Sequence, residues 1–224
     1  MKYPKIQTLW KRDPENKNRI IEGQLTKPEF DNIKTWMFTE KIDGTNIRIS
    51  WRSNVIGEVG KVQIDGRTDD AQIPSHLFNM LSQKFAADLF KNTFVKEGEG
   101  LDAPHEIILF GEGYGPKIQK GGGLYRDDAG FILFDVWIDG RWLDRPNVED
   151  IAKKMGLDIV PVLGIGSIYS AIDIVKSAPN SCISKSPKVI EGIVARSYPL
   201  VLFRDGDPLM FKLKVRDYTD LQKV

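Results

Sequence analysis

The sequence predicts an α+β fold built mostly from antiparallel sheets. Strand-like runs joined by short turns dominate the chain, and helical patterns occur as a few separate segments. Such an arrangement is typical of antiparallel α+β proteins. A strict alternation of strands and helices is absent from the sequence, so a Rossmann sheet is not expected. Since no repeat or low-complexity linker divides the 224 residues, we expect one domain over residues 1–224.

The first two predicted strands flank a short polar segment. Residues 36–40 form one apolar run, and residues 46–51 form another in which Ile47, Ile49 and Trp51 alternate with polar residues. This period of two is that of a half-buried strand. Asp43-Gly44 between them predicts a tight hairpin turn, because both residue types tolerate positive φ. The β character continues over residues 57–64 and ends in a loop at residues 65–70.

Helices and further strands are predicted in the middle of the chain. A helix starts at Pro74-Ser75, and its apolar residues recur every four positions as far as Leu89. A polar loop at residues 96–105 and a strand at residues 106–112 follow. After a glycine-rich loop at residues 113–123, a hairpin over residues 131–143 turns at Asp139-Gly140.

The rest of the chain contains two predicted helices and three strand-like runs. The first helix has Asn147 near its start and Gly156 at its C-terminal stop. A shorter helix is closed by Pro179. The strand-like runs are residues 189–197, 199–203 and 209–215, with a last turn at residues 204–208.

Composition excludes several classes of protein. Hydrophobic residues make up 41% and charged residues 28% of the chain, which is ordinary for a globular protein with a sizeable core. Cys182 is the sole cysteine, so an internal disulfide is excluded, and with only His76 and His105 a zinc cluster is not expected. We expect Cys182 to be a small core residue. The start lacks a signal peptide and no apolar run reaches the about 18 residues of a membrane span, so we expect a cytoplasmic protein.

Several charged residues interrupt apolar strands, which is costly unless the charges are paired or used. Lys41, just before Asp43-Gly44, is by itself consistent with a solvated lysine beside a turn. It could also be a nucleophile if its pKa were lowered. Lys212 and Lys214 lie on the same face of a strand, facing either solvent or an anion such as a phosphate.

Four further positions allow both a structural and a functional interpretation. Arg67 lies in a loop, where it is either solvated or a clamp for a phosphate or hydroxyl. Glu112 ends an apolar strand between two glycines, facing water or accepting hydrogen bonds from a ribose. Glu191 is either a surface charge or a magnesium ligand. Phe134 is either a core residue or an aromatic that stacks on a base.

The order of these segments carries more information than any one of them. KxDG, an arginine loop, an apolar run ending in GE, FDxW, EGIV and KLK follow one another from Glu40 to Lys214. This series resembles motifs I, Ia, III, IIIa, IV and V of the covalent nucleotidyltransferases, which include ATP-dependent DNA ligases, RNA ligases and mRNA capping enzymes. Asn46 in KIDGTN is closer to the RNA ligases than to the DNA-ligase pattern, which has an arginine there. Arg48 could partly replace that arginine.

The resemblance implies a fold and a reaction. The fold would be an ATP-grasp-like nucleotidyltransferase domain, with mostly antiparallel sheets flanked by helices around a nucleotide cleft. Lys41 would attack the α-phosphate of ATP and form lysyl–AMP, with Mg²⁺ or Mn²⁺ as the metal. The AMP would pass to a 5′-phosphate on a nucleic acid, and a 3′-hydroxyl would then seal the strand. Such covalent catalysis splits a difficult condensation into easier steps.

The resemblance also implies roles for individual residues. Lys41, Lys212 and Lys214 would be catalytic, and Glu191 would lie near the metal. The remaining residues implied in nucleotide binding are Glu40, Asn46, Arg67 (near the ribose or the incoming 5′-phosphate), Glu112 (on the ribose) and Phe134 (on adenine). We further expect Lys117 and Lys120 to touch the nucleic-acid backbone or the leaving pyrophosphate.

The preferred interpretation is an ATP-dependent RNA ligase of nucleic-acid repair, acting on 5′-phosphate and 3′-hydroxyl ends. The alternatives are a DNA ligase that seals nicks, a capping-type guanylyltransferase, and a nucleotide- or nucleic-acid-binding module without catalysis. No C-terminal OB-fold domain and no motif VI can be placed in the sequence. We therefore expect a minimal ligase, a domain that relies on a partner protein for a C-terminal domain, or a piece of a longer ligase.

Overall fold

The computed structural model describes residues 1–53, 60–95 and 103–219, which form two compact units. The first unit contains Met1–Tyr3 and Asp43–Ile159, and the second contains Pro4–Ile42 and the described residues from Val160 onward. The chain therefore passes from the second unit to the first directly after Ile42. One domain with two compact units would give this division, and so would two separate domains. The single domain over residues 1–224 therefore stays a prediction.

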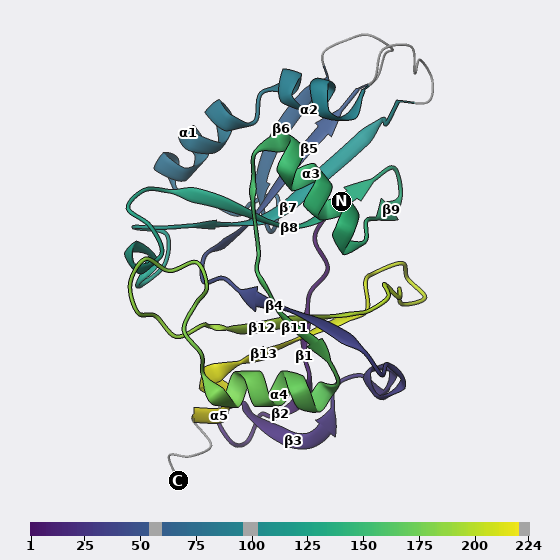
Figure 1. The fold of residues 1–224 in the computed structure, drawn as a ribbon, viewed down its shortest axis with the longest axis vertical. Coiled ribbons are helices and arrows are strands. Elements are labelled where there is room, and N and C mark those ends of the chain that lie inside the picture. The colour runs from purple at the N-terminus through teal and green to yellow at the C-terminus, as the bar shows by residue number, and fades with distance from the viewer. Residues whose placement is uncertain (54–59, 96–102, 220–224) are drawn as a thin grey trace. The chain divides into compact units, whose positions relative to one another are not determined.

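The first unit is built on a mostly antiparallel sheet (Figure 1) with the strand order β10-β8-β7-β5-β6 and β9 paired to β8. β10 pairs parallel with β8, and the other neighbours pair antiparallel. The strands are β5 (Thr45–Arg52), β6 (Lys61–Gly66), β7 (Glu106–Tyr114), β8 (Gly130–Ile138), β9 (Arg141–Trp142) and β10 (Asp158–Ile159).

One face of this sheet is covered by the helices α1 (Ser75–Lys84), α2 (Ala87–Phe94) and α3 (Arg145–Met155), which share its core. Ile47, Ile49 and Trp51 are buried in that core, so the predicted alternation along this strand is confirmed. The polar residues of β5 therefore face the opposite side of the sheet. This side is called the open face below because α1, α2 and α3 do not cover it, although Arg48 and Ser50 on it are buried. A 3-10 turn, η3 (Gly122–Leu124), lies in the loop after β7.

One prediction about helices needs correction. The single helix expected to reach Leu89 is two helices, because the backbone leaves helical geometry at Phe85, with φ −103° and ψ 66°. Phe85 is buried and packs edge-on against Phe131 at a centroid distance of 5.3 Å, which gives the break a packing role. The cap of α3 is Asp144, whose side chain accepts from the backbone N–H of Asn147. The stop at Gly156 is confirmed.

The predicted hairpin at Asp139-Gly140 is confirmed, with φ of 42° and 88° at the two residues. The predicted hairpin at Asp43-Gly44 is wrong. The strands on either side of it belong to different sheets, and neither residue has a positive φ. The segment is still a tight connection between two strands.

The second unit has a five-stranded sheet with the order β1-β13-β12-β4-β11 and a separate β2-β3 pair. Its strands are β1 (Gln7–Thr8), β2 (Trp10–Asp13), β3 (Arg19–Leu25), β4 (Trp36–Lys41), β11 (Val162–Gly166), β12 (Gly192–Ser197) and β13 (Met210–Lys214). Its helices are η1 (Pro28–Asn32), α4 (Ile168–Ser177) and α5 (Val215–Thr219). Trp36, Phe38, Ile193 and Phe211 are buried in the core of this unit.

The mixed α+β architecture with mostly antiparallel pairing is thus confirmed. Two more detailed predictions, one about a strand and one about Cys182, are wrong. The strand expected at residues 199–203 is a loop with an isolated bridge between Leu202 and Pro208, closed by a hydrogen bond from the Val201 N–H to Ser197 Oγ. Cys182 is exposed rather than a core residue. Most of the polar loop predicted at residues 96–105, and residues 57–59 of the predicted β segment, lie outside the described residues. Among the described helices, none has the length and apolar character needed to cross a membrane.

Candidate functional site

Lys41 ends β4 and lies in a row of three residues across the sheet of the second unit. In the strand register, Gly192 of β12 lies opposite Lys41 on one side and opposite Lys214 of β13 on the other. Residues directly opposite each other project their side chains on the same face. The structure therefore places Lys41 and Lys214 on one face, separated by a residue without a side chain.

Glu191, the residue before this glycine, bonds to both lysines. Its Oε2 accepts from Lys41 Nζ at 2.5 Å and its Oε1 lies 2.6 Å from Lys214 Nζ. All three side chains are largely buried, with exposed fractions between 17% and 23%. Burial alone would raise the pKa of the Glu191 carboxyl, but the two ammonium groups outweigh it and hold that pKa below its ordinary value. Glu191 is therefore ionised at neutral pH.

Glycine is required at position 192 because the strands approach closely there. A Cβ atom would overlap the carbonyl oxygen of Leu213 and lie 2.8 Å from the Cα of Lys214. Lys212, two residues before Lys214, projects on the same face of β13, whereas Phe211 and Leu213 are buried on the other. The predicted division of this strand into a lysine face and a core face is confirmed.

Glu40 lies on the opposite side of β4 from Lys41. Its side chain is 1% exposed, and Oε2 accepts a hydrogen bond of 2.9 Å from the backbone N–H of Cys182. Within the described parts of the chain, the other oxygen, Oε1, is buried without a hydrogen-bond partner. Leaving a buried acceptor unmatched is costly, so this oxygen is suited to accept from a ligand donor such as an amino group.

The predicted residues of the first unit lie on or beside its open face. Asn46 of β5 and Glu112 of β7 are directly opposite each other in the register. Asn46 Oδ1 is buried and, among the described residues, has no hydrogen-bond partner. At Gly44 a Cβ atom would overlap the carbonyl oxygen of Gly113 and lie 2.8 Å from Glu112 Cγ. Glycine thus lets the segment after Lys41 approach the strand that carries Glu112.

Two residues of the connection between β7 and β8 hold this segment. The backbone N–H of Asp43 donates to the hydroxyl of Tyr125 at 3.3 Å, and Gln119 Nε2 donates to the carbonyl of Gly44 at 3.1 Å. Lys117 and Lys120 of the same loop are exposed.

Phe134 lies in a β-bulge of β8. Leu133 pairs with Gly111 and Asp135 pairs with Phe110, so Phe134 is the extra residue on its strand. A bulge re-aims a side chain, and bulges are frequent beside functional sites. The ring of Phe134 meets Tyr3 edge-on at 4.9 Å, and the Tyr3 hydroxyl donates to Asp135 Oδ2 at 2.6 Å.

Arg67 directly follows the end of β6 and is exposed. The structure thus brings Lys41, Glu191 and Lys214 into contact, with Lys212 on the same face, and separately pairs Asn46 with Glu112. The two groups belong to different units. Sequence reasoning missed Tyr3, which lies 132 residues from its partner Asp135 and belongs to no local pattern.

A divalent metal fits the chemistry around Glu191. Glu191 offers two carboxylate oxygens, the hard ligands that Mg²⁺ prefers, but each is paired with an ammonium group. A metal would therefore replace at least one of these ammonium groups at the carboxylate, with the phosphates of ATP supplying further negative charge. In the described ranges, no three His, Cys, Asp or Glu residues cluster as a complete protein cage. Mg²⁺ usually needs no such cage, because it binds one or two carboxylates together with water and substrate phosphates.

Comparison with known proteins gives a family and a fold. A family model described as RNA ligase matches residues 34–214. No curated protein matches the chain. The fold is similar to structures of Naegleria gruberi RNA ligase with pyrophosphate (TM-score 0.63, 17% identity) and of a variant with ATP and manganese (TM-score 0.64, 17% identity). A further variant without ligand has a TM-score of 0.65 at 16% identity. All of this chain is covered, but only 58% or 59% of the Naegleria chains.

Proposed function

This chain belongs to the RNA ligase family, and we propose that it is an ATP-dependent RNA ligase that works through lysyl–AMP at Lys41. The observation that carries the proposal is the contact of Glu191 with both Lys41 and Lys214 in one row of the sheet. A lysine held among charged groups at a strand end is unusual for a solvated surface residue. It is the arrangement that a phosphate-directed nucleophile needs.

In the proposed reaction, the ammonium group of Lys41 first loses a proton to solvent. The neutral amine then forms an N–P bond with the α-phosphate of ATP and releases a second proton to solvent. The bond from that phosphorus to the bridging oxygen breaks, and pyrophosphate leaves. Lys212 and Lys214 hold the α-phosphate and offset its charge. The AMP then passes to the 5′-phosphate of a polynucleotide, and attack by a 3′-hydroxyl seals the strand and releases AMP.

Glu191 would hold Mg²⁺ or Mn²⁺, which when bound neutralises charge on the phosphates. The Naegleria ligase has been solved with ATP and manganese and with pyrophosphate, which is consistent with this cofactor pair.

The nucleoside would be recognised by residues with unused hydrogen-bonding capacity. Buried acceptors at Glu40 Oε1 and Asn46 Oδ1 match the amino and hydroxyl donors of ATP. In this proposal Glu112 accepts from the ribose, Phe134 stacks on adenine, and Arg67 contacts the ribose or the incoming 5′-phosphate. The chain covers 58% of the length of the Naegleria ligase. A partner protein that supplies a further domain is also part of the proposal.

The test of the nucleophile is covalent labelling with α-labelled ATP and magnesium, followed by a denaturing gel. The wild type is expected to carry the label, and Lys41→Ala is expected to carry none. Lys176→Ala is the matched control, because Lys176 is an exposed lysine of the same unit whose partner is Glu22. An unlabelled wild type would refute the enzyme assignment, and labelled Lys41→Ala would refute the site.

The substrate is tested with nicked RNA, nicked DNA and single-stranded ends of matched sequence. We expect RNA substrates to be sealed faster than nicked DNA. Preference for nicked DNA would instead establish the alternative, a nick-sealing DNA ligase.

A further inference from the structure

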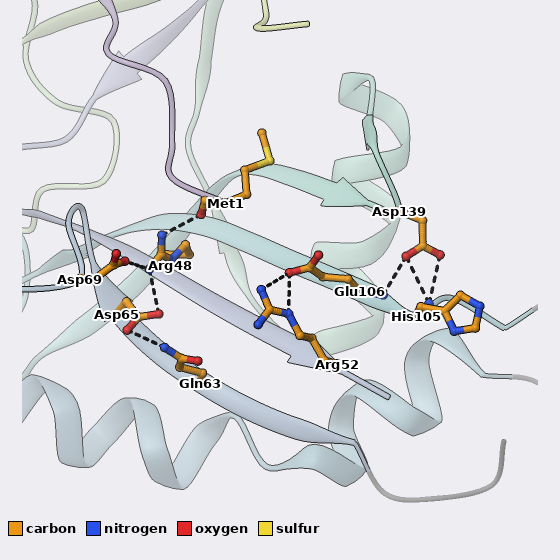
Figure 2. Close-up of polar contacts among 9 residues, drawn as sticks. All are labelled: Met1, Arg48, Arg52, Gln63, Asp65, Asp69, His105, Glu106 and Asp139. Atoms are coloured by element: carbon orange, nitrogen blue, oxygen red, sulfur yellow. Dashed lines mark hydrogen bonds and ion pairs between the residues drawn. The ribbon is translucent and has the colours of Figure 1, made fainter. Parts of the chain in front are cut away.

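Arg48 lies on the open face of the first unit, two residues after Asn46 on β5, and is almost fully buried. Its side chain is 7% exposed. Figure 2 shows its guanidinium between three partners. Nη2 lies 2.7 Å from Asp69 Oδ1 and 3.0 Å from Asp65 Oδ2, and Nη1 donates to the carbonyl oxygen of Met1 at 2.7 Å.

The two carboxylates bracket Arg67 in the sequence. Asp65 is the penultimate residue of β6 and comes two residues before Arg67, whereas Asp69 comes two residues after it. One guanidinium therefore holds both ends of the five-residue segment that presents Arg67. A planar guanidinium fixes its partners in a defined geometry, which a flexible ammonium does not.

The electrostatics of this cluster are consistent with permanent pairing. Burial alone would lower the pKa of Arg48, but its hydrogen bonds to Asp69 and Asp65 outweigh burial and raise that pKa above its ordinary value. The hydrogen bond from Arg48, with that from Lys2, lowers the pKa of Asp69. The guanidinium of Arg48 therefore stays charged at neutral pH.

We infer that Arg48 is a positioning residue for Arg67, acting through Asp65 and Asp69 to hold the loop that presents Arg67 to a phosphate or ribose. The inference rests on the proposed function, because it assigns Arg67 to substrate. It also explains why Arg48 does not itself need to meet the substrate. Its donors are directed at the loop and at the backbone of Met1.

The test compares the sealing of nicked RNA, as kcat/KM, among Arg48→Gln, Arg67→Ala and the double variant. Loss of a hydrogen bond between charged groups reduces a rate or affinity by about 10- to 100-fold, which is the expected effect of Arg67→Ala. Arg48→Gln is expected to lose a similar factor. If Arg48 acts only through Arg67, the double variant equals Arg67→Ala within about twofold, because the two effects share one path.

Two features keep the test interpretable. A cavity of about 380 Å³ adjoins Arg48, Asp65 and Asp69, so water can enter beside the shorter glutamine. Arg52→Ala is the matched control, since Arg52 lies on the same strand and face but pairs with Glu106, as Figure 2 shows, and it is expected to seal as the wild type does.

Further variants separate positioning from folding. Asp69→Asn removes the charge of an exposed side chain that pairs with Arg48 and Lys2 but keeps one acceptor oxygen, so it should reduce sealing less than Arg48→Gln, without loss of the fold. Arg48→Lys should be more active than Arg48→Gln but less active than the wild type, because it keeps the positive charge but not the planar guanidinium group.

Each outcome decides a different claim. If the wild type forms no lysyl–AMP, the proposed function fails. If the wild type seals RNA but Arg48→Gln or Arg67→Ala seals equally well, the inference fails. It also fails if the losses of the two single variants multiply in the double variant, because Arg48 would then act by another route.

Discussion

Replacing Glu191 with glutamine tests the central ion-pair arrangement most directly. The change keeps the size and one acceptor oxygen of the side chain but removes its charge. Lys41 and Lys214 then lie near each other without the anion between them. At 2.5–2.6 Å and an effective dielectric constant of about 20, Coulomb's law gives a gross attraction of about 6 kcal/mol for each pair.

The net effect is smaller, because desolvation offsets most of this attraction. Removing one partner of a buried pair typically costs about 3–5 kcal/mol. These side chains are 17–23% exposed to solvent, which lowers the cost relative to a fully buried pair. We therefore expect the free energy of unfolding to fall by about 2–3 kcal/mol at pH 7. For a chain of this length that corresponds to a decrease in Tm of about 5–10 °C.

The difference in stability between the wild type and Glu191→Gln should depend on pH. The folded-state pKa of Glu191 lies below its ordinary value of 4.5, so the unfolded state binds the proton more readily. The stabilisation is fully present above pH 4.5 and is lost as the pH falls through the folded-state pKa. The difference in Tm between wild type and Glu191→Gln should therefore be constant from pH 6 to 8 and shrink toward acid pH.

The control is Glu22→Gln, which breaks the exposed pair with Lys176 in the same unit and should cost about 0–1 kcal/mol. Lysyl–AMP formation should fall in Glu191→Gln and not in the control. Equal stability of Glu191→Gln and wild type at pH 7, or a difference that persists unchanged in acid, would refute the ion-pair reasoning.

Two further substitutions test the local geometry. Gly192→Ala should overpack the junction of β12 and β13, lowering the free energy of unfolding by about 1–3 kcal/mol and reducing lysyl–AMP formation. The control is Gly164→Ala in β11, where the added Cβ atom meets only ordinary contacts at 3.6–3.7 Å. Equal stability of the two variants in urea unfolding would contradict the close approach at Gly192. Tyr3→Phe removes the hydrogen bond to the buried carboxylate of Asp135 and should cost about 1–3 kcal/mol in the same assay, whereas Tyr169→Phe, at a residue 78% exposed, should change little. No loss in Tyr3→Phe would show that this bond does not stabilise the fold.

The strands were predictable from the sequence where burial on one face imposes a period of two. Ile47, Ile49 and Trp51 face the core of their sheet as expected, and so do Phe211 and Leu213 opposite the lysine pair. The helix boundary failed for a physical reason. The four-residue spacing of apolar residues runs unbroken past Phe85, so no local pattern marks the point at which tertiary packing turns its backbone out of the helix.

The sequence named candidate site residues, and three of them lie in contact in the structure, but it did not predict the contacts themselves. The order of the motifs singled out Lys41, Glu191 and Lys214, yet their contact depends on strand register between segments 150 residues apart. Register follows from pairing of whole strands, which no short motif encodes. The bonds of Arg48 to both sides of the Arg67 loop escaped prediction for the same reason, although the acidic residues around Arg67 were visible in the sequence.

In the segment after Lys41, close packing rather than turn geometry explains the glycine. Asp43-Gly44 was expected to form a hairpin because glycine tolerates positive φ, but its φ is not positive and the flanking strands do not pair. The glycine is needed instead because a Cβ atom would collide with the backbone of Gly113 beside Glu112. The constraint therefore fixes the Asp43-Gly44 segment against the strand that carries Glu112, a proposed ribose ligand. A change at Gly44 should disturb both lysyl–AMP formation and the environment of Glu112, whereas a defect in a simple hairpin turn would alter only the local connection.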